Sequence, residues 1–255
     1  MSGTSKLLME MYQAMRHRLG RQGWWPGETP LEICVGAILT QNTNWTNVEK
    51  AIANLKAAGA MSIPALHAMP PAKLAELIRP AGHFNVKARR LKNFIARVFE
   101  TYGENLGGAP SGKADAASAP HPAQASASVP PHDAIAAPGF LDRPVSVLRE
   151  ELLSINGIGR ETADSIILYA AGKLTFVVDA YTYRILLRHH LIAPEDDYEA
   201  IKEFMESNLP AEVELWNDCH AQFVAVGKNY CRPVARCEGC PLESFPHDRL
   251  AGGRQ

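Results

Sequence analysis

Only one segment of this chain, LTFVV at 174–178, has the residue pattern of a β-strand. A single strand cannot make a sheet, because its backbone groups need a neighbouring strand. Elsewhere the apolar residues recur at helical spacing, as at Leu91, Phe94 and Val98. The sequence therefore predicts an all-α fold in which 174–178 is a buried connection.

A helix start is visible at 29–32, TPLE. Thr29 is suited to cap the helix, Pro30 fits its first position, and Glu32 is spaced to close a capping box. We therefore expect a helix from Pro30 to about Leu39.

Size and charge narrow the class of protein. A chain of 255 residues, 46% of them hydrophobic, is large enough for one or two buried cores. Residues 1–20 have the pattern of an amphipathic helix, and no apolar run approaches the ~20 residues of a membrane span. We expect a cytoplasmic protein without a membrane partner. The net charge of -1 means that a nucleic-acid partner has to be sought in local basic patches.

Residues 107–139 interrupt the helical pattern with alanine, proline, serine and glycine. Such a composition offers too little apolar surface to offset the entropy of ordering the chain. We predict a disordered insertion, read as a loop within a domain rather than a boundary between domains.

The stretch SINGIGRETADSII at 154–167 places two glycines between two helical patterns. Gly157 and Gly159 permit a tight hairpin, because glycine accepts positive φ and a close backbone approach. The start of the following helix presents free N–H groups that suit a phosphate. The alternative is that both glycines only end one helix and form a turn.

INGIGRETADSIILYAAG followed by VVDAYTYRI resembles the helix-hairpin-helix and aspartate signature of the endonuclease III-like (HhH-GPD) DNA glycosylases, and AILTQNTNWTNVEKA and GHFNVKARRLKNF occur in the expected order. The resemblance implies two helical domains with the active site in the cleft between them. One domain comprises 1–29 and 182–255, including a cysteine-rich loop. The other is a six-helix barrel at 30–181 with the hairpin at about 149–170. The implied partner is double-stranded DNA that contains a damaged base, bound by a monomer.

Asp179 is the expected catalytic residue. By residue type it suits the N-cap of the helix that follows. The resemblance also places its carboxylate in the cleft, where it would stabilise the sugar cation or activate water. Glu161 occupies the position at which the bifunctional relatives carry a lysine that forms a Schiff base. A carboxylate cannot form an imine, so we expect no lyase activity and interpret Glu161 as a solvated charge.

Two side chains are expected to fill the gap that a flipped nucleotide leaves in the duplex. The resemblance assigns these wedge positions to Asn42, in LTQNT, and His83, in AGHFN. The alternative is that Asn42 caps a helix and His83 is an ordinary surface side chain.

Three of the four tryptophans lie near the expected cleft. WWP at 24–26, followed by an aromatic residue at 45, resembles the 3-methyladenine branch of the superfamily. That resemblance implies a base pocket formed by Trp24, Trp25, Pro26 and Trp45. Electron-rich indole faces suit a flat cationic base. The alternative for such a group is simple core packing.

Three of the five cysteines are clustered at Cys231, Cys237 and Cys240. The resemblance implies a four-iron, four-sulfur cluster there. The first spacing is one residue short, however, and the expected fourth cysteine is replaced at about Pro246. His247 or Cys219 could supply the missing ligand, and an empty loop is the alternative.

Positive charge gathers locally, and we expect it to contact DNA phosphates without sequence preference. The predicted phosphate-binding residues are Gly157, Gly159, Arg160 and Lys87. Further basic residues near them or near the cysteines are Arg89, Arg90, Lys92, Lys228, Arg232 and Arg236.

These expectations lead to one hypothesis and two alternatives. The hypothesis is a monofunctional glycosylase that hydrolyses the N-glycosidic bond of alkylated purines of the 3-methyladenine type. The alternatives are a bifunctional glycosylase and lyase that acts on oxidised pyrimidines, and a helix-hairpin-helix module that binds DNA without catalysis.

Overall fold

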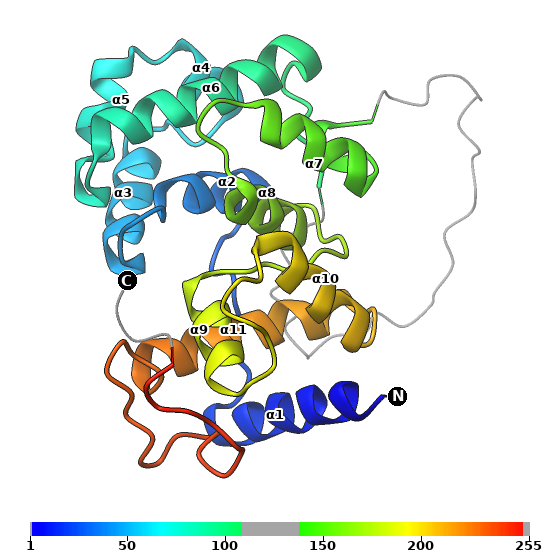
Figure 1. Cartoon of the computed structure of the whole chain (residues 1–255). Coiled ribbons are helices and arrows are strands. Elements are labelled where there is room, and N and C mark those ends of the chain that lie inside the picture. Colours follow the sequence, from blue (N-terminus) through cyan, green and yellow to red (C-terminus); the bar gives the residue numbers. More distant parts are fainter. Residues whose placement is uncertain (1, 109–137, 252–255) are drawn as a thin grey trace, which may run out of the picture.

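A computed structural model describes residues 2–108 and 138–251 of the chain (Figure 1). All regular elements within these ranges are helical, which confirms the all-α prediction. Residues 174–178 form an irregular connection, in which Phe176, Val177 and Val178 are buried. Most of the predicted insertion at 107–139 lies outside the described residues.

The helices in chain order are α1 (Gly3–Leu19), α2 (Pro30–Leu39), α3 (Trp45–Ala57), α4 (Ile63–Ala68), α5 (Pro71–Leu77), α6 (Phe84–Tyr102), α7 (Val145–Ser154), α8 (Arg160–Ser165), α9 (Ala180–Arg188), α10 (Tyr198–Asn208) and α11 (Val213–Asn229). Short 3-10 turns lie at η1 (Arg79–Ala81) and η2 (Phe140–Asp142), and a π-helical turn, η3 (Ile166–Ala170), continues α8. None of the described helices is both long and apolar enough to cross a membrane.

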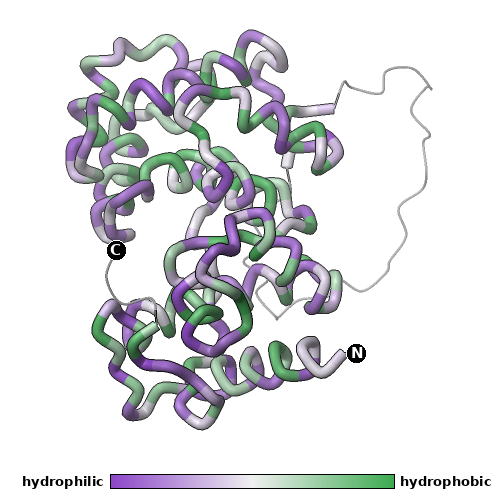
Figure 2. Tube along the Cα trace, in the orientation of Figure 1, coloured by the Kyte–Doolittle hydropathy of each residue, from purple (hydrophilic) through white to green (hydrophobic). Residues whose placement is uncertain are grey.

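The helices pack in two groups (Figure 1). In one group α6 packs on α4 and α5, and α2 packs on α3 and α6. In the other group α11 packs on α9 and α1. The turn η3 contacts both α2 and α11. Figure 2 shows α2 as a mostly apolar segment in the interior of the fold. The division into domains at 29/30 and 181/182 stays a prediction.

Apolar spacing explains the packing of α1, which was expected as an amphipathic helix. Leu8, Met11, Tyr12 and Met15 lie on one face and are buried. The opposite face carries charged residues and stays in water, so burial of one stripe fixes this helix to the body of the protein.

The start of α2 follows the prediction in part. Thr29 is the N-cap, and its hydroxyl accepts a hydrogen bond from the N–H of Glu32 at 3.2 Å. The Glu32 carboxylate does not close a box on Thr29. It accepts from the N–H of Glu28 at 3.1 Å and pairs with Lys56 at 2.9 Å. The Glu32 carboxylate, which is paired with Lys56, thus bonds the N–H of Glu28 and not that of Thr29, which a capping box would use.

Candidate active site

A cavity of about 500 Å³ opens between segments that are far apart in the sequence. Its walls come from the segment before α2, the loop between α2 and α3, the start of α8, and parts of α9 and α11. Among the lining residues are Trp24, Trp25, Asn42, Trp45, Glu161 and Asp179. The structure thus brings the predicted acid and three predicted pocket residues to one cavity. The size is typical of a small-molecule site.

The three tryptophans contact one another at the cavity wall. Ring centroids are 5.1 Å apart for Trp24 and Trp25, 5.3 Å for Trp24 and Trp45, and 5.1 Å for Trp25 and Trp45. Gly36 on α2 makes this packing possible. A Cβ at Gly36 would lie 3.0 Å from Nε1 of Trp25 and 3.2 Å from Trp45.

The two indole N–H groups of Trp24 and Trp25 are buried without a hydrogen-bond partner among the described residues. Unpaired buried donors are uncommon in folded proteins, and those that occur often have a functional role. Pro26 differs from its predicted role, because it is exposed and does not line the cavity.

Asp179 serves as the N-cap of α9, as expected. Its Oδ1 accepts from the N–H of Thr182 at 2.7 Å and from the hydroxyl of Thr182 at 2.9 Å. The side chain is only 11% exposed, and Oδ2 lies 3.6 Å from Nε2 of His220. Burial opposes ionisation of Asp179, but His220 and the Thr182 bonds outweigh it and lower the pKa. The carboxylate is therefore fixed in one orientation and ionised at neutral pH.

His220 is a site residue that the sequence analysis missed. It is buried on α11, and its Nδ1 is hydrogen-bonded to the hydroxyl of Tyr169. Burial raises the pKa of Tyr169 well above its usual value, so this hydroxyl stays protonated. The bond to Tyr169 fixes the orientation of the His220 ring, so that Nε2 faces Asp179. Tyr169 also contacts Trp25, with ring centroids 5.3 Å apart, which joins the tryptophan wall to the acid.

Glu161 lies in the cavity, so its interpretation as a freely solvated charge was incomplete. Glu161 is the second residue of α8, directly after the hairpin. It is exposed and lines the cavity. The surrounding protein displaces water from the carboxyl group and, together with the negative charge of Asp179, raises the pKa of Glu161 to about 7. His220 opposes this shift. The two carboxyl groups of the cavity therefore differ in protonation near neutral pH.

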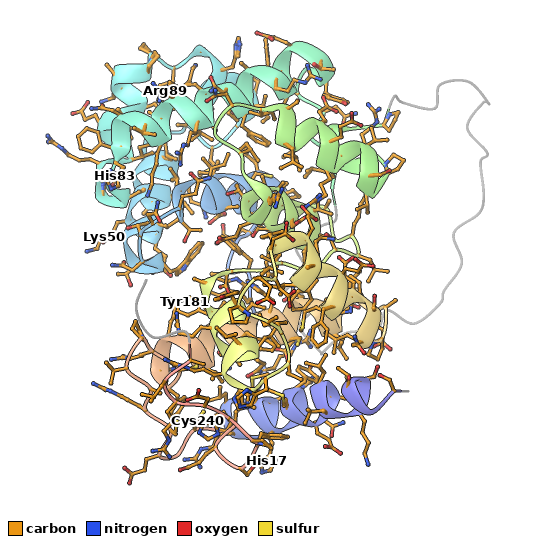
Figure 3. All side chains as sticks on the ribbon, in the orientation of Figure 1. His17, Lys50, His83, Arg89, Tyr181 and Cys240 are labelled. Atoms are coloured by element: carbon orange, nitrogen blue, oxygen red, sulfur yellow. The ribbon has the colours of Figure 1, made fainter. Side chains whose placement is uncertain are left out.

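The two predicted wedge residues occupy exposed turns. Asn42 has a φ of 54° and lines the cavity. The alternative role of Asn42 as a helix cap is filled by Asn44, which caps α3. His83 has a φ of 44° at the start of α6 and does not line the cavity. Tyr181 does line the cavity, and Figure 3 shows His83 and Tyr181 both toward the left of the view. Insertion of either wedge into DNA stays a prediction.

Lys87 requires a correction, since the structure places it in the interior rather than on the phosphate-binding surface. It is 2% exposed, and its ammonium donates to the carbonyl of Leu39 at 2.8 Å and to that of Ala81 at 2.7 Å. Burial, with a smaller effect of Arg90, lowers its pKa to about 8. These carbonyls end α2 and η1, and the turns of Asn42 and His83 follow them. Through these two hydrogen bonds Lys87 links the backbone segments that precede the two turns.

Replacement of Lys87 by methionine is expected to lower the free energy of unfolding by about 1–3 kcal/mol, because two carbonyls lose a buried donor. Urea unfolding measures this effect, with the exposed Lys73→Met on α5 as the control.

The salt dependence of DNA binding separates the structural role of Lys87 from the predicted phosphate contact. A lost phosphate contact reduces the slope of log K against log salt by about 1. We expect that reduction for the exposed Arg89→Met and not for Lys87→Met, and a reduced slope for Lys87→Met would contradict the structural role.

The hairpin between α7 and α8 has the predicted form. Gly157 has a φ of +101°, and a Cβ there would lie 2.3 Å from Cγ of Arg90, so this turn needs glycine. A Cβ at Gly159 would have no atom within 4 Å, so this position faces open space. Gln41 joins the hairpin to the loop of Asn42, because its amide donates to the Gly157 carbonyl at 3.2 Å.

Arg160 points from the hairpin toward α10. Its guanidinium lies 3.3 Å from Glu199 and 3.9 Å from Asp197, and its side chain is 51% exposed. Both carboxylates compete with a DNA phosphate for this cation. The contribution of Arg160 to phosphate binding, like that of the two glycines, stays a prediction.

The three clustered cysteines line one cavity of only about 20 Å³, together with Arg188 and His247. This space holds about one water molecule. Arg188 is buried beside them and donates to Sγ of Cys231 at 3.2 Å and to the carbonyls of Arg232 and Pro233. A buried guanidinium thus organises the loop.

The described residues contain no group of three histidine, cysteine or acidic side chains placed to hold a metal ion. Cys219, a suggested fourth ligand, is buried on α11 away from the small cavity, whereas His247 lines it. Burial raises the pKa of Cys240 to about 11, which disfavours a free thiolate. Among the described residues no complete ligand set for an iron–sulfur cluster is assembled, and the cluster stays a prediction.

Known proteins with related sequences include a putative DNA repair glycosylase and endonuclease III. A putative DNA repair glycosylase of Methanocaldococcus jannaschii is 40% identical over 240 residues, which cover 94% of this chain and 96% of the relative. Endonuclease III of Thermotoga maritima is 25% identical and covers 84% of this chain and 81% of its own length.

Solved structures with the same fold include two glycosylase complexes. The 3-methyladenine DNA glycosylase of H. pylori bound to 1,N6-ethenoadenine has a TM-score of 0.66 and 25% identity, over 88% of this chain and 97% of its own. A non-covalent endonuclease III–DNA complex has a TM-score of 0.68 and 20% identity, over 96% of each chain. The family model described as "HhH-GPD superfamily base excision DNA repair protein" matches residues 35–211. This chain therefore belongs to the HhH-GPD superfamily of base excision DNA repair glycosylases.

Proposed function

We propose that this protein is a monofunctional DNA glycosylase that hydrolyses the N-glycosidic bond of alkylated purines of the 3-methyladenine type. The observation that carries the proposal is the single cavity lined by Asp179 and the indoles of Trp24, Trp25 and Trp45. An extruded base needs a pocket and a nearby group that acts on its sugar, and this cavity offers both.

Asp179 supplies the chemistry. As the glycosidic bond breaks, positive charge develops on the sugar, and the fixed carboxylate stabilises it. The same group can accept a proton from the attacking water. Because its pKa lies below the usual aspartate value, Asp179 is ready for both tasks at neutral pH.

The indole wall supports a purine substrate that carries positive charge. Indole faces attract cations and stack on flat rings, with about 1–3 kcal/mol per stacked base. An alkylated purine such as 3-methyladenine has both properties, and its charge weakens the bond to the sugar. The H. pylori 3-methyladenine DNA glycosylase, solved with 1,N6-ethenoadenine, supports a modified purine as the substrate, although the base in that complex is uncharged.

Glu161 in place of an amine supports hydrolysis without strand cleavage. One observation favours the bifunctional alternative. The amine of Lys228 on α11 lines the same cavity, with Nζ 5.6 Å from the ring centroid of Trp24. Lys228 is therefore the residue that a covalent intermediate would use.

Release of bases from methylated DNA tests the proposal directly. We expect 3-methyladenine among the products and no covalent adduct after borohydride treatment, with endonuclease III as the positive control for trapping. An adduct that disappears in Lys228→Gln would establish the bifunctional alternative. DNA binding without release of any base would favour a non-catalytic module.

The predicted iron–sulfur cluster is separate from this proposal, since no step uses the thiols of Cys231, Cys237 or Cys240. The monomeric state and the phosphate contacts of the hairpin likewise stay predictions about how the protein holds DNA.

A further inference from the structure

Two carboxyl groups line the tryptophan cavity, and their surroundings differ. Asp179 is held by two hydrogen bonds from Thr182 and faces His220. The carboxyl group of Glu161 lines the same cavity without a comparable set of donors from the described part of the chain. When two acids share a site and their environments separate their protonation states, one can act as an acid while the other stays ionised.

We propose that Glu161 is a second catalytic group, which protonates uncharged purine lesions as they leave and so extends the reaction beyond cationic lesions. This inference rests on the proposed function. A purine that already carries positive charge leaves as a neutral molecule and needs no proton. An uncharged purine would leave as an anion, and a proton delivered to a ring nitrogen removes that cost.

Atoms and charges balance when the lesion is an uncharged purine. The bond between C1′ and the purine nitrogen breaks, and both its electrons go to the base. The proton of Glu161 moves to a ring nitrogen of the base. Water adds to C1′, and Asp179 accepts the proton that this water loses. Proton exchange with solvent then returns both carboxyl groups to their starting states, leaving a neutral purine and an abasic sugar.

The position of Glu161 between two cavities supports this role. Besides the tryptophan cavity, it lines a second cavity of about 710 Å³, again together with Asp179. Solvent protons therefore have a route to Glu161 from the side away from the indoles. A leaving base on the tryptophan side and a proton supply on the other side are what a general acid requires.

The charges around Glu161 favour its protonated form near neutrality. Displacement of water and the ionised Asp179 raise its pKa to about 7, and His220 opposes the shift. The other titratable groups lining the two cavities are Tyr181, Tyr183, Arg184, Asp196, Tyr198 and Lys228. Burial raises the pKa of Tyr181 and of Tyr198, so both tyrosines are neutral in this range.

The experiment compares single-turnover release of an uncharged lesion, 1,N6-ethenoadenine, with release of cationic 3-methyladenine. For the wild type we expect ethenoadenine release to fall tenfold per pH unit above about 7, where Glu161 loses its proton. Release of 3-methyladenine should be flat over the same range. Glu161→Gln should slow ethenoadenine release by about 10²–10⁴-fold and remove this pH dependence. Its effect on 3-methyladenine should be under about threefold.

Other outcomes would contradict either the proposed role of Glu161 or the proposed function. Equal losses on both lesions in Glu161→Gln would show a structural role, and an unchanged ethenoadenine rate would exclude proton donation. A wild type that releases 3-methyladenine but no ethenoadenine at any pH would overturn the inference and leave the proposed function intact. No release of either lesion would overturn the proposed function itself. Glu203→Gln, exposed on α10, is the matched control, and thermal unfolding checks that each variant is folded.

Discussion

Asp179→Asn is expected to reduce single-turnover release of 3-methyladenine by about 10²–10⁴-fold while the protein stays folded and binds DNA. Asparagine caps a helix about as well as aspartate, so the bond from the N–H of Thr182 can persist. The amide cannot accept a proton from water or carry negative charge beside the sugar. Loss of activity in this variant therefore reports chemistry rather than folding.

Asp197→Asn provides the matched control for this substitution. Asp197 caps α10 through the N–H of Ala200 at 3.0 Å and lies outside the tryptophan cavity. At saturating enzyme, where its contact with Arg160 does not affect the rate, it should match the wild type in rate and in unfolding temperature. Base release by Asp179→Asn at the wild-type rate would remove Asp179 from the mechanism. A large loss in both variants would mean that helix capping, and not the cavity, is the cause.

Trp45→Leu is expected to slow release of 3-methyladenine by about 5–150-fold, which corresponds to the loss of one stacking contact of about 1–3 kcal/mol. Leucine keeps apolar volume next to Trp24 and Trp25 but has no π face. Trp45→Phe keeps an aromatic face and should stay close to the wild type. The comparison of leucine with phenylalanine separates stacking from burial, and rates measured at saturating and subsaturating enzyme show whether binding or the chemical step is affected.

Trp216→Phe is the control for loss of an indole elsewhere. Trp216 is 4% exposed in the core, where it contacts Phe176 and donates to the carbonyl of Pro210 at 2.8 Å. We expect lower stability with an unchanged rate of base release. If Trp45→Leu releases the base as fast as Trp45→Phe, the indole wall is packing only and the proposed base pocket is wrong.

The elements that were predicted correctly carry their information locally. The cap formed by Asp179, the start of α2 at Thr29 and the turn at Gly157 each depend on residues within one or two helical turns. Local preferences of this kind are readable without knowledge of the fold.

The errors arose where a polar residue lies on an apolar stripe. Lys87 is spaced by four residues from Leu91 and by eight from Ile95, on the buried face of α6, yet its charge suggested a surface role. His220 lies on α11 between the buried Trp216 and Phe223. In both helices the spacing predicts burial better than residue type does.

The setting of Glu161 could not be predicted, because it depends on distant segments. Its cavity needs the loop of Asn42, the turn before α9 and the end of α11 to meet. The charge of Asp179 acts on Glu161 only once these parts are folded together.

The grouping of three indoles has an optical consequence. Three of the four tryptophans share one cavity wall with centroids 5.1–5.3 Å apart, close enough to exchange excitation energy, while Trp216 is buried elsewhere. If the proposed base pocket is correct, a nucleobase stacked on that wall is expected to quench the emission of the group and to leave Trp216 as an internal reference. The protein would then contain its own fluorescent reporter of the moment at which a nucleotide leaves the helix.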